Sequence, residues 1–326
     1  MSFSTQLVTN FNQVRSDWDI LLNQSRLNEI FLSSLWQETW WDHFSNKNLL
    51  NIIVLSKEDD IVGIVPLMIK KSVLTFISNT ELVDYSDFIT RNKSKELYLS
   101  IWEAMLDLDW VRCELCSIPG NSPILEIYPK LAEDHGFKVE VIKEDTTPYI
   151  LLPETWDDYL SNLSKKQRHE IKRKIRKLDS FGKVEFRELK EPEFVRKELD
   201  VFFDLHRSSS AEKSEFLTSV RRQFIQDISI KLAEKKMLTL SFLDIDSQPV
   251  AACLAFESQD TYFLYNSGYN HDFSDLSVGI MAKVYSIRNA IVRKKKIYDF
   301  LRGGEFYKYQ LGAKDRYIFK LEINRC

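Results

Sequence analysis

Tyr-Phe-Leu-Tyr-Asn-Ser-Gly-Tyr-Asn-His-Asp-Phe-Ser-Asp-Leu-Ser-Val-Gly, residues 262–279, is the most informative stretch of the chain. Its apolar start predicts a strand, and the apolar periodicity that follows the polar loop predicts a helix over 277–293. Ser277 can cap that helix, and Gly279 lets a ligand approach the backbone amides of its first turn. A helix start of this kind binds anions and suits a pyrophosphate, so Ser277, Val278 and Gly279 are candidate phosphate-binding residues. An ordinary capped helix would show the same pattern.

The second informative stretch is Tyr-Asp-Phe-Leu-Arg-Gly-Gly-Glu-Phe-Tyr-Lys, residues 298–308. An apolar strand leads directly into two glycines, and open α/β sheets bind ligands beside polar groups at the carboxyl ends of their strands. Glu305 could act as a general base on an attacking amine or hydroxyl, and Lys308 could hold a phosphate or stabilise an oxyanion. A surface turn with a Glu–Lys pair explains the same residues without any chemistry.

A strongly basic helix is predicted over 164–178, where eight of fifteen residues are Lys or Arg and only one is acidic. Ser164 and Gln167 have the spacing of a capping box, and apolar residues recur every three to four positions as one narrow stripe. The remaining surface is basic and includes Arg168 and Arg173. This face would bind an anionic ligand or surface, although a solvated surface helix has the same composition.

Charge is distributed unevenly along the chain. Residues 1–150 hold 13 Lys/Arg and 22 Asp/Glu, a net charge of −9, whereas residues 151–326 hold 32 and 26, a net of +6. The basic helix alone supplies +7, which leaves −1 for the rest of that half. The whole chain has a net charge of −3, which argues against a protein that coats polyanions generally. Its 326 residues, 44% of them hydrophobic, suffice for two domains of ordinary size.

The predicted elements follow a similar plan in both halves. In the first half we expect helices over 11–22, 34–44, 94–107 and 123–135, and strands over 49–55, 61–69, 73–77, 111–118 and 137–143. In the second half we expect helices over 192–208, 212–235 and 277–293, and strands over 183–189, 238–243, 249–256, 262–267, 297–301 and 316–323. Helices, a hairpin, a strand, a helix and a strand follow one another in each half. This order predicts an α/β protein with α+β mixed sheets, built from two similar domains.

The four cysteines, Cys113, Cys116, Cys253 and Cys326, fit reduced thiols in a cytoplasmic protein. Cys113 and Cys116 form a C-x-x-C, but a strand places residues three apart on opposite faces, and no second motif or histidine pair accompanies it. No metal site is therefore expected. The start of the chain lacks the pattern of a secretory leader, and no stretch approaches the length of about eighteen apolar residues that a membrane span needs.

Four stretches together resemble the CelD-type, BioF-like branch of the GNAT acetyltransferase superfamily, which is related to the Fem peptidoglycan aminoacyl transferases. They are Leu-Ser-Lys-Lys-Gln-Arg-His-Glu-Ile-Lys-Arg-Lys at 163–174, Leu-Tyr-Asn-Ser-Gly-Tyr at 264–269, Ser-Val-Gly at 277–279 and Asp-Phe-Leu-Arg-Gly-Gly-Glu-Phe-Tyr-Lys at 299–308. They occur in the family's order, and the first half of the chain matches more loosely. The chain also departs from the family, because Ser-Val-Gly holds less glycine than a standard GNAT pyrophosphate loop.

The resemblance implies two tandem GNAT-like domains joined by the basic helix, with boundaries at 1–152, 153–182 and 183–326. The acyl donor would enter the split between central strands, with its pyrophosphate near Ser277, Val278 and Gly279. Glu305, Tyr307 and Lys308 would form the reacting end, because Fem-type relatives use a lysine in a Tyr-Lys pair. We expect the acceptor to contact Tyr265, His206, Arg302, Arg168 and Arg173, although a packed, hydrogen-bonded His206 fits its amphipathic helix equally.

The resemblance implies a cytoplasmic N-acyltransferase that moves an acyl group from acetyl-CoA or another acyl-CoA to an amine, without a metal. The acceptor would be a small-molecule or carrier-linked anion, such as an amino sugar for cell-envelope or exopolysaccharide synthesis. Two alternatives stay open. The donor could be an aminoacyl-tRNA whose phosphates bind the basic helix, or the fold could serve as a non-catalytic binding module. The sequence leaves the acceptor and the oligomeric state open.

Overall fold

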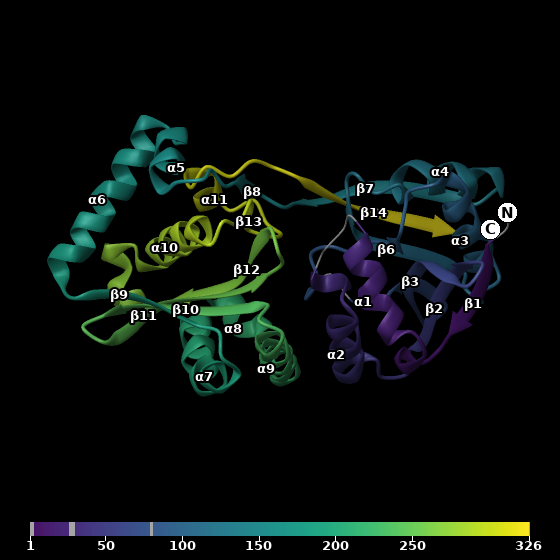
Figure 1. Cartoon of the computed structure of the whole chain (residues 1–326), viewed down its shortest axis with the longest axis horizontal. Coiled ribbons are helices and arrows are strands. Elements are labelled where there is room, and N and C mark those ends of the chain that lie inside the picture. Colours follow the sequence, from purple (N-terminus) through teal and green to yellow (C-terminus); the bar gives the residue numbers. More distant parts are fainter. Residues whose placement is uncertain (1–2, 26–29, 79–80, 326) are drawn as a thin grey trace. The chain divides into compact units, whose positions relative to one another are not determined.

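The computed structural model describes residues 3–25, 30–78 and 81–325 (Figure 1). The chain forms two compact units, each built on a mixed sheet of its own. The first unit comprises Met1–Thr146 together with Arg316–Cys326, and the second comprises Thr147–Asp315. The expected α/β class with mixed sheets is confirmed.

The first sheet has the strand order β1-β2-β3-β4-β6-β14-β7, with β5 paired to β3. Among the described strands, only β4 and β6 are parallel neighbours, and their ladder spans residues 73–75 and 112–114. The strands are β1 Ser4–Val8, β2 Leu49–Lys57, β3 Asp60–Lys70, β4 Val73–Phe76, β5 Ile89–Thr90, β6 Arg112–Pro119, β7 Lys138–Thr146 and β14 Tyr317–Asn324.

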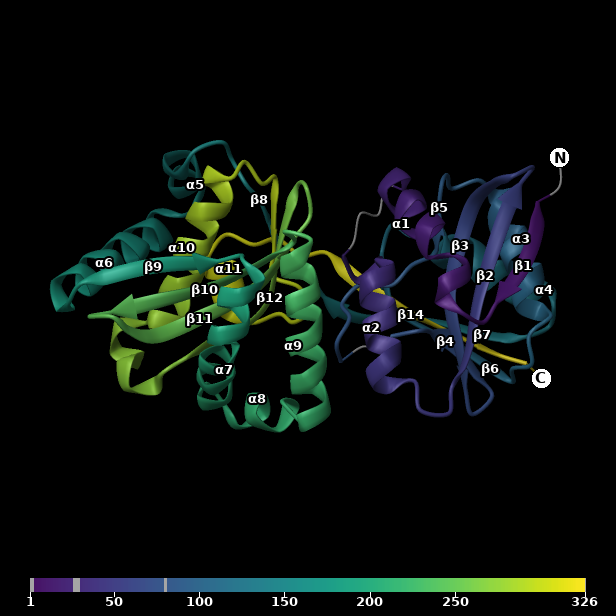
Figure 2. The same ribbon diagram turned by 60° about the horizontal axis from the view of Figure 1, so that its bottom comes forward.

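Helices cover both faces of the first sheet (Figure 2). The helices are α1 Arg15–Gln24, α2 Ser34–Phe44, α3 Lys95–Leu106 and α4 Ile124–Asp134, with short 3-10 turns η1 Phe11–Gln13 and η2 Ile30–Leu32. One face packs against α3 and α4 through a core that includes Trp102 and Tyr128, whose ring centroids lie 5.3 Å apart. Cys113 is buried in this core and Cys116 lies on the opposite face, so the predicted separation of the two thiols is confirmed.

The second sheet has the strand order β8-β13-β12-β11-β10-β9. Here too only one neighbouring pair of described strands is parallel, namely β12 and β13. The strands are β8 Tyr149–Leu151, β9 Val184–Leu189, β10 Leu238–Ile245, β11 Gln248–Glu257, β12 Thr261–Tyr269 and β13 Ile297–Asp299. The central strands β10 and β11 are almost wholly buried, as continuous apolar runs require.

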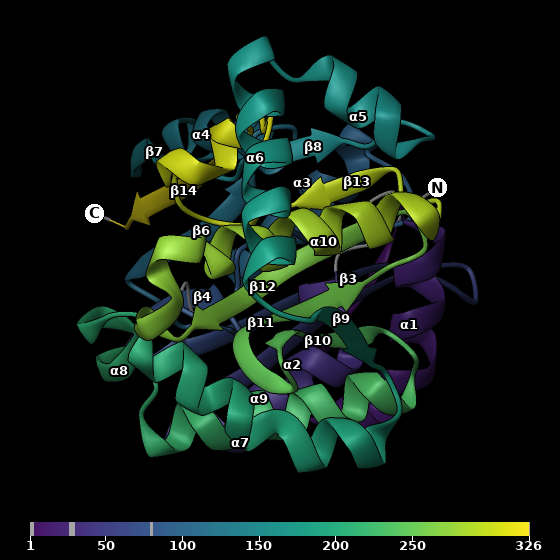
Figure 3. The same cartoon turned by 90° about the vertical axis from the view of Figure 1, so that its left-hand side faces the viewer.

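Helix α10 lies on one face of the second sheet, and α7 and α9 lie on the other (Figure 1). Figure 3 shows the long basic helix α6 beside α10. The helices are α5 Trp156–Asn162, α6 Lys165–Phe181, α7 Pro192–Ser208, α8 Ala211–Phe216, α9 Ser219–Glu234, α10 Val278–Val292 and α11 Phe306–Gln310, with the 3-10 segment η3 His271–Leu276.

The structure divides the chain differently from the expected boundaries 1–152, 153–182 and 183–326. The last strand, β14, lies between β6 and β7 of the first sheet, because its apolar side chains Ile318, Leu321 and Ile323 belong to the first core. Helix α6 packs by Ile171 and Leu178 into the second core, so it is part of the second unit as well as a connection. The expected helix over 212–235 is two helices, α8 and α9.

Candidate functional site

Strands β12 and β13 separate after a short parallel ladder. Residues 261–263 pair with 297–299, after which β13 ends and β12 continues to Tyr269 with β11 alone beside it. Tyr265 lies at a bulge in this second half of β12, because Leu254 pairs with Asn266 and Ala255 with Leu264. The carboxyl ends of diverging parallel strands are the usual place for a ligand in an open sheet.

Residues 299–308, which we call the β13–α11 segment, turn sharply at the end of β13. Leu301 has a left-handed backbone (φ 59°) and its amide donates to Asp299 Oδ1 at 2.8 Å. Gly303 has φ 103°, and a Cβ atom there would lie 2.7 Å from Glu305 Oε2. The glycine is therefore required both by the backbone and by the approach of the Glu305 carboxylate.

Lys308 links the backbone of the β13–α11 segment through hydrogen bonds. Its ammonium donates to the carbonyl oxygens of Leu301, Arg302 and Gly303 at 3.2, 2.8 and 2.8 Å. It also lies 2.8 Å from Glu305 Oε2. Since an ammonium has three N–H donors, these four oxygens occupy all of them. The side chain of Lys308 is 2% exposed, whereas that of Glu305 is 56% exposed. Lys308 thus positions Glu305, and Glu305 presents a carboxylate to solvent.

Two further lysines, Lys283 buried and Lys213 partly buried, lie near the β13–α11 segment. Lys283, on α10, donates to Gly279 O at 2.9 Å and lies 4.9 Å from the centroid of the Tyr307 ring. Lys213, on α8, donates to Ser267 O at 2.5 Å, in the half of β12 that β13 does not accompany. Within the described part of the chain, neither lysine forms an ion pair with a carboxylate. Burying an unpaired ammonium is costly, so both positions are unusual for structural lysines.

Burial sets the ionisation of these groups. It lowers the pKa of Lys213 to about 8, helped by the charge of Lys283 and opposed by the carboxylate of Glu305. Burial likewise lowers the pKa of Lys283, again with Glu305 among the opposing groups. The Tyr307 phenol has a pKa raised by burial and by Glu305, so it stays neutral. The site therefore combines one accessible carboxylate with two amines whose protonated forms burial disfavours.

His206 is a packed residue on α7. It is 2% exposed, and its Nε2 lies 3.0 Å from Asn266 Oδ1 on β12. Burial and the charge of Lys213 lower the pKa of His206 to about 4, so its imidazole is neutral at pH 7. Gly268 permits this packing, because a Cβ there would lie 2.3 Å from the His206 backbone nitrogen. In the structure His206 supports β12.

The start of α10 differs from the sequence expectation in one respect. Ser277 occupies the cap position with a left-handed backbone (φ 57°) and its side chain makes no capping hydrogen bond. Its carbonyl accepts from the amides of Ile280 and Met281, both at 3.0 Å. The amides of Val278 and Gly279 have no acceptor among the residues that the structure describes. Gly279 is also required by packing, because a Cβ there would lie 2.9 Å from the Tyr269 ring.

Helix α6 presents the expected basic face. The capping box of Ser164 and Gln167 is confirmed, and Gln167 Nε2 also donates to Tyr309 O at 3.0 Å. Arg173 pairs with Glu170 at 2.7 Å, which reduces its availability to a ligand, and Arg168 Nη1 lies 3.5 Å from Ser161 O. A shallow hollow of about 490 Å³ is lined by His169, Lys172, Ile175 and Arg176.

The structure brings the predicted residues Glu305, Tyr307 and Lys308 together and adds Lys213 and Lys283, which the sequence analysis missed. Lys283 carried a signal, since it has apolar neighbours on both sides within Val278–Val292, whereas Arg288, the other basic residue of that helix, is exposed. Lys213 carried none, because its place depends on how α8 reaches β12. No group of His, Cys, Asp or Glu side chains within residues 3–25, 30–78 and 81–325 is arranged to hold a metal.

Residues 165–309, which include α6, α10 and the β13–α11 segment, match the family model described as an acetyltransferase (GNAT) domain. The chain contains a GNAT acetyltransferase domain. This domain indicates an acyltransferase. The matched residues lie within the second unit. No curated protein sequence matches the chain. None of the helices in the described residues is long and apolar enough to cross a membrane.

Solved structures share the fold over nearly the whole chain. The crystal structure of FemX aligns with a TM-score of 0.70 and 11% identity, covering 97% of this chain and 96% of that one. L-PGS from Bacillus licheniformis aligns with a TM-score of 0.61 and 11% identity, covering 95% and 91%. A tandem GNAT protein from the clavulanic acid biosynthesis pathway aligns with a TM-score of 0.52 and 10% identity, covering 98% of each. The GNAT enzyme therefore has the tandem GNAT-like fold expected from its sequence.

Proposed function

We propose that this GNAT enzyme transfers an acyl group from acyl-CoA, acetyl-CoA in the simplest case, to the amine of an anionic acceptor. An amino sugar or a related cell-envelope or exopolysaccharide precursor is the acceptor class we favour, in keeping with the CelD-type, BioF-like branch that the sequence motifs resemble. The observation that carries this proposal is the half-exposed carboxylate of Glu305, which Lys308 fixes near two lysines without a carboxylate partner.

Glu305 is the residue we assign to proton removal. An amine attacks an acyl carbon only as the free base, so its ammonium must first lose a proton. One oxygen of Glu305 is held by Lys308, which leaves the other to accept that proton. Lys213, whose pKa of about 8 leaves it mostly protonated at pH 7, adds positive charge near the same carboxylate. Nearby positive charge disfavours an ammonium and lowers its pKa, so Lys213 assists the deprotonation.

The start of α10 is the place we assign to the donor's phosphates. Two backbone amides without acceptors, those of Val278 and Gly279, lie at the positive end of a helix of fifteen residues. The Lys283 amine lies one turn further along the same helix, where it donates to Gly279 O at 2.9 Å. These groups fit an anionic donor, although the absence of a glycine-rich loop makes the cradle smaller than the family's usual one.

The basic face of α6 is the surface we assign to the acceptor's anionic part. Lys172 and Arg176, which line its hollow, make no ion pair among the described residues. Their attraction for an anion would weaken with salt, because both are exposed. The same face favours a second candidate function, in which the donor is an aminoacyl-tRNA whose phosphates bind α6. A cytoplasmic location suits either donor and fits Cys113, Cys116 and Cys253, which form no disulfide among the described residues.

The proposal is tested by measuring acyl transfer from acetyl-CoA to a panel of amino sugars and their phosphates, with and without the Glu305→Gln substitution. Removing a positioned base should lower kcat about a hundredfold to ten-thousandfold. Glu185→Gln is the matched control, since Glu185 is an exposed carboxylate on β9 of the same unit. Turnover by aminoacyl-tRNA and not by acyl-CoA would select the second candidate. A Glu305→Gln enzyme with wild-type kcat would overturn the role of Glu305.

A further inference from the structure

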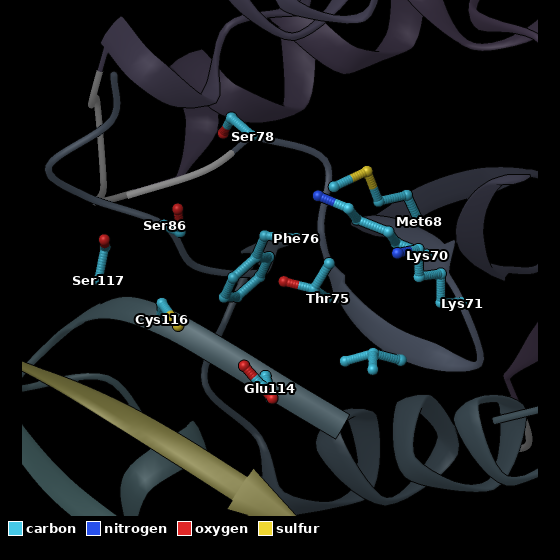
Figure 4. Close-up of a pocket in the computed structure, with 11 residues that line it drawn as sticks. Met68, Lys70, Lys71, Thr75, Phe76, Ser78, Ser86, Glu114, Cys116 and Ser117 are labelled. Carbon is cyan, nitrogen blue, oxygen red and sulfur yellow. The ribbon is translucent and has the colours of Figure 1, made fainter. Parts of the chain in front are cut away.

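The first unit contains a cavity of about 350 Å³ that the acyl-transfer site does not use. It lies on the face of the sheet opposite α3 and α4, over β3, β4 and β6. Figure 4 shows Met68, Lys70 and Lys71 on one side, Cys116 and Ser117 on the other, and Phe76 between them. Its volume is at the lower end of the range of small-molecule sites.

The cavity occupies a place where the fold favours ligands. Strands β4 and β6 run parallel over residues 73–75 and 112–114 and pair no further. Thr75 and Glu114 are the last pair of this ladder, the lining residues Phe76 and Ser78 follow it on one strand, and Cys116 and Ser117 follow it on the other. The cavity therefore lies over the ladder and extends past the carboxyl ends of two diverging parallel strands, the position that binds ligands in open α/β sheets.

Hydroxyl groups form the inner wall of the cavity. Ser78 is 6% exposed, and its Oγ has no hydrogen-bond partner among the residues that the structure describes. A buried hydroxyl without a partner costs free energy, which a ligand oxygen or nitrogen would recover. Thr75, Ser86 and Ser117 add further hydroxyls, while Met68 and Phe76 provide apolar contact. This combination suits a polyhydroxylated ring more than a purely apolar ligand.

The mouth of the cavity carries net positive charge. Lys70 and Lys71 are exposed and form no ion pair within the described part of the chain. The lining carboxylate, Glu114, does not cancel them, because it is already paired with Arg112 at 2.7 Å and with Lys320 at 3.3 Å. Two lysines at the mouth of a hydroxyl-lined cavity attract a phosphate group.

We infer that this cavity binds a sugar phosphate, with the ring against Ser78 and Phe76 and the phosphate between Lys70 and Lys71. Both a free sugar phosphate and a nucleotide-linked one present this chemistry. The inference does not rest on the proposed acyl transfer, and its test measures no turnover.

The test uses the thiol of Cys116, which lines the cavity and is half-buried, whereas Cys113 and Cys253 are buried. In a Cys326→Ser background, the rate of Cys116 alkylation by iodoacetamide is measured with glucose 1-phosphate, UDP-glucose, glucose or inorganic phosphate at millimolar concentration. We expect glucose 1-phosphate or UDP-glucose to slow alkylation at least about fivefold, and glucose and phosphate to have little effect, since each supplies only half of the contacts. Protection by UDP-glucose alone would assign the nucleotide-linked source.

Matched variants locate the ligand. Lys70→Gln/Lys71→Gln should raise the dissociation constant about tenfold, and Ser78→Ala should raise it about three- to tenfold without loss of folding. The control is Lys235→Gln/Lys236→Gln, because that exposed pair also precedes a strand and Lys236 is left-handed (φ 59°) like Lys71 (φ 51°). If neither sugar phosphate protects Cys116, or if the lysine variants bind as tightly as the control, the inference is wrong.

Discussion

Each of the two units contains one pair of parallel strands that diverge, but different groups lie beside the two pairs. In the first unit, β4 and β6 pair in parallel over three positions, and a cavity with serine and lysine side chains at its wall and mouth lies over this ladder and past its end. In the second, β12 and β13 also pair over three positions, but the β13–α11 segment with Glu305 and Lys308 follows the ladder. Parallel strands that diverge thus create a site without deciding its chemistry, which depends on the segment that follows.

Burial shifts one pKa in each unit, in opposite directions. In the first unit, burial raises the pKa of the Asp87 carboxyl group to about 7. In the second, burial lowers the pKa of the partly buried Lys213 amine to about 8. The contrast concerns these two groups alone, because the second unit also buries the carboxyl groups of Glu257 and Asp299.

The largest effect is expected from Lys308→Met, because this substitution removes the group that positions the side chains of the second site. Three carbonyls would lose their donor and Glu305 would lose its partner. We expect kcat to fall about a hundredfold or more, since Glu305 would no longer be positioned. The pH dependence of any residual activity separates positioning from folding, because a merely structural role would lower the active fraction and leave the pH profile unchanged.

A smaller effect is expected from Asp87→Asn in the first unit. Asp87 Oδ1 accepts from Ser122 Oγ and from the Phe88 amide, and an asparagine oxygen can do the same. The folded-state pKa is above the unfolded value, so Asp87 stabilises the fold at low pH and this contribution is lost as pH rises from about 4 to about 7.

Urea unfolding at pH 5 and pH 8 checks this expectation. Between pH 5 and pH 8, the free energy of unfolding should fall by about 2 kcal/mol less in the variant than in the wild type. Asp59→Asn, an exposed turn position, should leave the pH dependence unchanged. The comparison of the two units would fail if Asp87→Asn flattened the pH dependence of acyl transfer and left that of unfolding as it was.

The smallest effect is expected from charge reversal on α6, Lys172→Glu/Arg176→Glu. We expect the acceptor KM to rise about tenfold at low salt and the difference to shrink at high salt, because these exposed charges are screened. Steady-state kinetics at two ionic strengths measure it. An unchanged KM at low salt would mean that α6 is a solvated surface helix without a binding role. The control for net charge is Lys235→Glu/Lys236→Glu.

Much of the fold followed from local patterns, and the departures have identifiable causes. Hydrophobic periodicity and capping residues placed α6, α10, β11 and β12 within a few residues of their bounds, because those elements are long and strongly patterned. The position of β14 could not be predicted, since a strand's partners are set by cores formed elsewhere. Serine is a residue type typical of helix caps, but the backbone of Ser277 is left-handed and its side chain makes no capping hydrogen bond.

Part of the candidate site was also predictable from the sequence. Glu305, Tyr307 and Lys308 lie within one short segment, so sequence proximity implied spatial proximity. Lys213 and Lys283 are seventy positions apart and meet Glu305 only through the packing of α8 and α10 around β12. The cavity of the first unit collects residues 68–117 from three strands, and its isolated serines and lysines gave no motif.

The place of β14 has a consequence for synthesis on the ribosome. Strand β14 pairs with both β6 and β7, which have no ladder with each other, yet it is made only after the whole of the second unit. Domains usually fold in the order of their synthesis, from the N-terminus onward. The first sheet therefore lacks the strand between β6 and β7 until the second unit has been synthesised. The later half of the chain can then fold before the earlier half has its complete sheet.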